Sequence, residues 1–109
     1  GVLSPDDLTL DMAHLLRHSG PWGQAFPEPV FDGVFDVIEQ RLVGGHHLKL
    51  TLQHPDGQYP LSAICFNVDL KLWPNYDCRQ VQVVYRLDIN AFRNQTTLQL
   101  MIDQLWEAS

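Results

Sequence analysis

The sequence predicts an all-β domain: a five-stranded OB-type Greek-key barrel, preceded by one short N-terminal helix and a Gly/Pro-rich strap. Five segments carry apolar residues at a period of two, which is typical of half-buried strands. The first of these segments is long, and a break separates the third from the fourth. A long first strand with that break is typical of an OB-type barrel.

The totals favour one globular domain. The chain has 109 residues and 45% hydrophobic content. We expect residues 1–29 to form a linker helix and strap, and residues 30–109 to form the barrel. No apolar run approaches the roughly 20 residues of a membrane helix, so no membrane partner is expected. The chain begins with glycine instead of methionine, which favours a fragment of a longer protein.

The first 20 residues predict a short amphipathic helix. Ser4 suits an N-cap, Pro5 the first turn, and two acidic residues follow where the helix dipole favours them. Apolar residues then recur at helical spacing: Leu8, Met12, Leu15 and Leu16. Residues 18–21 end the helix. Residues 20–29 place Trp22 and Phe26 among Gly and Pro, so we expect a strap on the barrel end or a junction with a neighbouring domain.

Residues 30–43 predict the first strand, and residues 46–53 the second. In the first, Phe35 and Val37 share one parity while Ile38 and Leu42 share the other, which indicates a bulge or sharp bend. A helix face is the alternative for this segment. Gly44 and Gly45 form the predicted hairpin. The second strand alternates cleanly, with three leucines inside: Leu48, Leu50 and Leu52.

The remaining strands are predicted at residues 61–70, 79–90 and 97–106, after a turn at residues 54–57. Phe66 and Tyr85 are expected in the core, and a polar loop is expected at residues 90–95. The fifth strand is expected to point four residues inward: Leu98, Leu100, Ile102 and Trp106.

No catalytic or metal-binding motif emerges. The five histidines and the two cysteines lack paired ligand spacing, and His46 and His47 would point to opposite faces of a strand. His14 and His18 lie four residues apart on the predicted helix but have no third ligand nearby. No G-x-S-x-G or Gly-rich phosphate loop occurs. We expect no independent enzyme activity, no metal site, and reduced cysteines in a cytoplasmic setting.

The charge balance argues against a stand-alone nucleic-acid binder. Seven Lys and Arg face thirteen Asp and Glu, for a formal net charge of −6. Nucleic-acid binders usually carry a basic surplus. A local basic stripe, aided by other domains, would be needed for DNA binding. The charge alone favours a protein or small-molecule partner.

Several stretches resemble the C-terminal OB domain of the RecJ family of single-strand-specific 5′→3′ DNA exonucleases, a branch of the DHH family, in its proteobacterial form. They are GPWGQAFPEPVF at residues 20–31, RLVG at 41–44, HLKL at 47–50, AICFN at 63–67, VYRLDINAFR at 84–93, and LQLMI at 98–102 with Trp106. The resemblance covers nearly the whole chain.

The resemblance implies a parent hydrolase whose Mg or Mn ions are held by Asp and His residues of a DHH domain. This chain has no Asp-His-His motif, so it is expected to be inactive alone and to hold no cofactor. Gly44, Gly45 and His46 are similar to the Gly-Gly-His motif of the DHHA1 region. They lie in a predicted hairpin, so that role is not carried over.

OB barrels bind single strands across strands two and three, between the loop joining strands one and two and the loop joining four and five. That face predicts these DNA contacts: Arg41, His46, His47, Lys49, Arg86, Asn90, Phe92 and Arg93. Trp73 is a further candidate for base stacking. Two alternatives remain open: Arg86 pairs with Asp88 or Glu39, and Phe92 caps the barrel end.

The resemblance therefore implies a domain that binds and guides single-stranded DNA during recombination and repair. The alternative is a docking module that braces the DHH and DHHA1 domains of the same chain or recruits single-strand-binding protein. A free-standing small-ligand barrel has only fold analogy in its favour.

Overall fold

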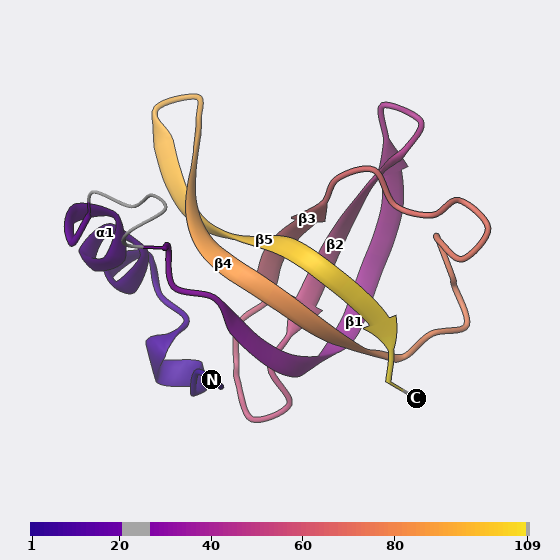
Figure 1. Cartoon of the computed structure of the whole chain (residues 1–109), viewed down its shortest axis with the longest axis horizontal. Coiled ribbons are helices and arrows are strands. Elements are labelled where there is room, and N and C mark those ends of the chain that lie inside the picture. The colour runs from indigo at the N-terminus through magenta and orange to yellow at the C-terminus, as the bar shows by residue number, and fades with distance from the viewer. Residues whose placement is uncertain (21–26, 109) are drawn as a thin grey trace.

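Five strands close into one barrel in the computed structural model, which describes residues 1–20 and 27–108 (Figure 1). The strands are β1 (Phe31–Val43), β2 (His47–Gln53), β3 (Leu61–Cys65), β4 (Gln80–Phe92) and β5 (Gln95–Glu107). Their order around the barrel is β1-β2-β3-β5-β4, with β3 and β5 parallel and the other pairs antiparallel. The predicted five-stranded OB-type barrel is confirmed. Part of the predicted strap, residues 21–26, lies outside the described residues.

The N-terminal helix begins later than predicted. A short 3-10 turn, Pro5–Asp7, precedes α1 (Leu10–His18). Leu8 between them is buried in the core, and Thr9 is the N-cap, its Oγ1 accepting a hydrogen bond from the Met12 amide at 3.1 Å. The prediction of a continuous helix from Ser4 was therefore wrong, because burial of Leu8 interrupts it. Within the described residues no helix is long and apolar enough to cross a membrane.

The predicted irregularity of the first strand is a bulge. The pairing of β1 with β2 shifts register between Val37 and Glu39, which leaves Ile38 as the extra residue. Ile38 is 54% exposed, and Gln40 takes the next inward position. A bulge adds one residue to one strand, so it reverses which side chains face the core.

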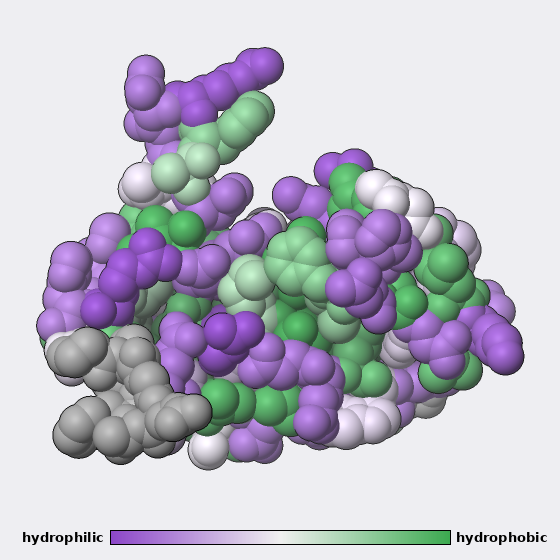
Figure 2. Space-filling model, turned by 45° about the horizontal axis from the view of Figure 1, so that its top comes forward, coloured by the Kyte–Doolittle hydropathy of each residue, from purple (hydrophilic) through white to green (hydrophobic). Residues whose placement is uncertain are grey.

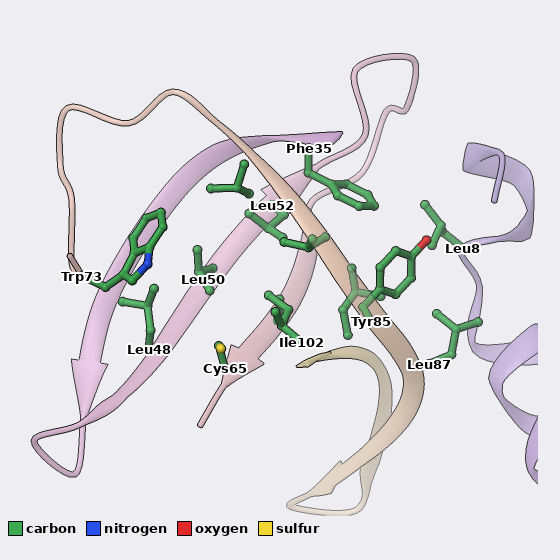
Figure 3. Close-up of a cluster of buried hydrophobic side chains, with 14 of the residues drawn as sticks. Leu8, Phe35, Leu48, Leu50, Leu52, Cys65, Trp73, Tyr85, Leu87 and Ile102 are labelled. Carbon is green, nitrogen blue, oxygen red and sulfur yellow. The ribbon is translucent and has the colours of Figure 1, made fainter. Parts of the chain in front are cut away.

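Side chains from every strand fill the barrel, and the two ends are closed by segments outside it. Leu48, Leu50 and Leu52 are buried as predicted, and so is Tyr85. Figure 3 shows Trp73 at one end of this cluster and Leu8 at the other. Trp73 is only 6% exposed, so its predicted role in base stacking was wrong.

A second bulge reverses which side chains at the end of β5 point inward. The pairing of β4 with β5 shifts between Val84 and Tyr85, because Tyr85 pairs with Ile102 while Val84 pairs with Gln104. Asp103 is therefore the extra residue. As a result Trp106 points outward and is 48% exposed, contrary to the prediction that it faces the core.

One buried polar side chain secures the long connection between β3 and β4. Gln40 is 7% exposed, and its side-chain amide bonds the backbone of Asn75 in both directions. The Asn75 amide donates to Gln40 Oε1 at 2.9 Å, and Gln40 Nε2 donates to the Asn75 carbonyl oxygen. This contact holds the connection that carries Trp73.

Gln40→Leu should lower the free energy of unfolding by about 1–3 kcal/mol, because both backbone groups of Asn75 lose their partner. Urea denaturation measures the change. The matched control is Gln104→Leu, at an exposed position of β5. It should change the free energy of unfolding by less than about 0.5 kcal/mol. Equal effects of the two variants would contradict the role given to Gln40.

Tyr85 should make the fold sensitive to alkaline pH. Burial, with a smaller contribution from Asp32, raises the pKa of Tyr85 from 10.0 to about 12. The unfolded chain loses this proton near pH 10, while the folded chain keeps it. Stability that is fully present below pH 10 is therefore lost as the pH rises to 12, by about 2–3 kcal/mol.

Tyr85→Phe should remove most of this alkaline loss of stability. Denaturant midpoints measured between pH 9 and pH 12 test it, in the range set by the pKa of Tyr85. Tyr76→Phe is the control, because Tyr76 is 73% exposed. If Tyr85→Phe loses as much stability at alkaline pH as the original chain does, other groups cause the loss.

Candidate nucleic-acid interface

A row of outward side chains crosses four strands of the barrel. Arg41 on β1 stands opposite Lys49 on β2, and Lys49 stands opposite Ile64 on β3. Ile64 in turn stands opposite Met101 on β5. Because Leu48 and Leu50 point into the core, Lys49 between them points outward. The row therefore lies on the outer face of the barrel, across β1, β2, β3 and β5.

Two like charges meet at the head of this row. Arg41 and Lys49 are direct cross-strand partners, and neither forms an ion pair with a carboxylate in the described parts of the chain. Glu39 lies on the same strand and is exposed, yet it joins no ion pair with any described residue. Like charges directly opposite each other destabilise an antiparallel pair. Binding of an anion there would relieve the repulsion.

His46, His47 and Phe66 form an aromatic cluster beside this pair. The ring centroids of His46 and His47 are 4.0 Å apart. Those of His47 and Phe66 are 5.0 Å apart, and the two rings meet edge to face. His46 lies in the turn before β2, so the prediction that the two histidines point to opposite faces was wrong. Phe66 is 51% exposed, so its predicted place in the core was also wrong.

The hairpin between β4 and β5 carries three predicted contact residues. The predicted polar loop is instead a strand that continues to Phe92 and a tight turn at Arg93 and Asn94, whose φ values are 52° and 64°. Such positive values at both positions are typical of a two-residue type I′ turn. Phe92 is 66% exposed beneath the Arg93 guanidinium, 5.1 Å from the ring centroid, so it does not cap the barrel. Asn90 lies further back, paired with Thr97.

Two hairpins flank the outer face of β2 and β3. In Figure 1 the β1–β2 and β4–β5 hairpins both rise at the top of the view, one to each side of these strands. Figure 2 shows a projecting mass of mostly hydrophilic side chains, separated by a dip from the rest of the surface. The predicted DNA contacts lie on β1, on β2 and in these two hairpins, except Arg86, which lies further back on β4.

Arg86 differs from the other predicted contacts because carboxylates already engage it. Its guanidinium donates to Asp103 at 2.9 Å and to Glu28 at 3.1 Å. Hydrogen bonds to Asp103 and then Glu28 raise the pKa of Arg86. The expected partners were Asp88 or Glu39, but Asp88 pairs with Arg17. The bulge at Asp103 explains the difference, since it turns this carboxylate toward Arg86.

No metal-binding or thiol chemistry is evident in the described parts of the chain. Across residues 1–20 and 27–108, no group of three or more His, Cys, Asp or Glu converges as a metal site requires. Cys65 and Cys78 are buried and unpaired, and burial raises the pKa of each thiol. A raised pKa leaves less of the reactive thiolate at neutral pH.

A different surface covers β1, β4 and β5. Val34 and Trp106 flank Gln82 across these strands, and both are partly exposed. Asp32 and Asp36 lie on either side of Val34 on the same face of β1. This surface is apolar and acidic, in contrast to the face that carries Arg41 and Lys49.

Curated relatives cover almost the whole chain. It is 52% identical over 106 residues to "Single-stranded-DNA-specific exonuclease RecJ" of Escherichia coli (strain K12), a match that covers 97% of this chain and 18% of the relative. The protein of the same name from Haemophilus influenzae is 40% identical over 107 residues, which cover 96% of this chain and 19% of that protein. The chain thus spans about a fifth of the length of these relatives.

A solved structure and a family model agree with these matches. The crystal structure of RecJ from Thermus thermophilus with Mg²⁺ superposes with a TM-score of 0.75 at 21% identity. The superposition covers 99% of this chain and 16% of that one. The model of the "RecJ OB domain" matches residues 1–104. The chain belongs to the RecJ OB domain family.

Proposed function

We propose that this domain binds and guides single-stranded DNA as the non-catalytic part of a RecJ-like 5′→3′ exonuclease acting in DNA recombination and repair. The observation that carries the proposal is the cross-strand pair of Arg41 and Lys49, with which no described carboxylate forms an ion pair. The relatives named single-stranded-DNA-specific exonucleases support the choice of ligand. The pair also lies on the face by which OB barrels hold single strands.

The exposed cations bind the phosphates of the strand, and the negative charge of the rest of the surface repels them. Lys49 and Arg41 face the DNA backbone near the β1–β2 hairpin, and Arg93 meets it at the β4–β5 turn. The net charge of −6 opposes binding elsewhere, so the isolated domain should bind weakly. The domain would steer a strand toward the catalytic domains and leave hydrolysis to them. Its described residues do not fit the paired metal ions of such an active site.

Lys49→Ala should weaken binding of a single-stranded oligonucleotide of about 15 nucleotides, a length near the upper site size of an OB fold. The slope of log affinity against log salt should fall in magnitude by about 0.7, the value for one phosphate contact in a single strand. Fluorescence anisotropy over a series of salt concentrations measures both quantities. Arg41→Ala should act in the same direction.

Arg79→Ala is the matched control, because it removes one positive charge from an exposed position just before β4 that is not a member of the cross-strand row of Arg41 and Lys49. It should leave the salt slope unchanged. An equal loss for Lys49→Ala and Arg79→Ala would show a response to net charge alone. That result would contradict the assignment of the site.

A second candidate function is docking onto protein, favoured by the exposed Val34 and Trp106 on the acidic face. Apolar groups rimmed by charge are typical of protein contacts. The partner would be the DHH and DHHA1 domains of the same parent chain or single-strand-binding protein. The two functions use different faces, so one domain can perform both.

Trp106→Gln should abolish or weaken at least tenfold the binding of this chain to a separately produced catalytic region, measured calorimetrically at high salt. Its affinity for the oligonucleotide should stay the same. Leu15→Gln, at a 61% exposed position on α1, is the control. Binding that is unchanged in Trp106→Gln would exclude this face as the docking surface.

A further inference from the structure

We propose that Phe66 is the platform on which one DNA base stacks, an inference that rests on the proposed DNA-binding function. Phe66 follows the last residue of β3 and was expected in the core, but half of its surface is exposed. A phenyl ring exposed to this degree loses hydrophobic stabilisation. A stacked base would cover the ring and recover part of it.

The backbone on both sides of Phe66 is held by three contacts with the start of β2 and the turn before it. Cys65 pairs with Leu48, and the Val68 amide donates to the His46 carbonyl oxygen at 3.0 Å. The Asn67 amide donates to His47 Nδ1 at 3.1 Å, which places the proton of the neutral imidazole on Nε2. These contacts fix the backbone that carries the phenyl ring before a ligand arrives. A ligand then binds at a smaller cost in conformational entropy.

His47 braces the phenyl ring from one side. The two rings meet edge to face, with centroids 5.0 Å apart and planes at 77°. This geometry is a favourable one for aromatic pairs. Contact with His47 covers part of the ring, and the exposed part remains for a flat ligand.

Two cations, Lys49 and Arg41, lie close to the ring of His47. Lys49 is two residues from His47 on β2, roughly 7 Å at the usual rise of a strand, and both face outward. Arg41 is the cross-strand partner of Lys49. A base on Phe66 would therefore leave its phosphate close to these two cations.

Other exposed aromatic rings in the described residues are less suited to this role. Phe92 already stacks against Arg93, at the tip of a hairpin. Tyr59 lies in the connection between β2 and β3, beside the N-terminal segment. Tyr76 lines a hollow with Ile38 and Arg79. Phe66 alone among these combines an open ring, a rigid support and adjacent cations.

The test compares Phe66→Leu with Phe66→Trp in the complete 109-residue chain. Phe66→Leu keeps an apolar side chain but removes the aromatic face, so affinity for the oligonucleotide should fall about tenfold. Phe66→Trp should restore it. Because neither change alters charge, the salt slope should stay the same. Fluorescence anisotropy measures the affinity of each variant and the salt slope, and circular dichroism checks that both variants fold.

An abasic oligonucleotide with the same number of phosphates isolates the stacking interaction. The original chain and Phe66→Leu should bind it equally. Tyr59→Leu is the control for loss of an exposed aromatic ring, and its affinity for the normal oligonucleotide should not change.

The outcomes separate this inference from the proposed function. If Phe66→Leu binds the normal oligonucleotide as well as the original chain does, while Lys49→Ala is impaired, the platform is wrong and DNA binding stands. A loss of the same size with the abasic oligonucleotide would also overturn the platform. If the original chain binds neither oligonucleotide at low salt, the proposed function fails and the platform fails with it.

Discussion

Closure of the barrel is the constraint on which the rest of this structure depends. Pairing β3 with β5 and β1 with β4 leaves no long open sheet edge among the described strands, but it forces the strands to bend. The bends occur at bulges, at Ile38 in β1 and Asp103 in β5. Each bulge reverses the side-chain alternation beyond it. Gln40 therefore points inward to hold the β3–β4 connection, and Asp103 turns toward Arg86.

The same geometry separates the charges of an acidic domain. Arg17 on α1 pairs with Asp88, and Arg86 on β4 pairs with Glu28 and Asp103. The cross-strand pair of Arg41 and Lys49 forms no ion pair with a described carboxylate, so its charge stays available. Partly exposed ion pairs add little stability, so their main consequence here is where free positive charge remains. A net charge of −6 is thus compatible with a local phosphate-binding row.

Regular alternation made most of the barrel predictable, and local irregularity limited the rest. The three inward leucines of β2 and Tyr85 of β4 were correctly predicted to be buried. Trp106 was misplaced because no residue type marks the bulge at Asp103. Phe66 was placed in the core because it ends the apolar run that begins at Ala63, although strict alternation from Ala63 points it outward. Lys49 and Arg41 were predicted on one face. Only the strand register shows that they are direct partners, and only the side-chain positions show that neither forms an ion pair with a described carboxylate.

Two-dimensional amide NMR can map where an oligonucleotide binds on this domain, because the chain has a mass of only 12.5 kDa. On titration with a single-stranded oligonucleotide, we expect the amide shifts to concentrate at Arg41, His47, Lys49 and Phe66, and at the β4–β5 turn. The amides of Gln82 and Trp106, on the acidic face, should stay unchanged. Shifts confined to that acidic face, or none at low salt, would contradict the central claim that the row headed by Arg41 and Lys49 holds single-stranded DNA.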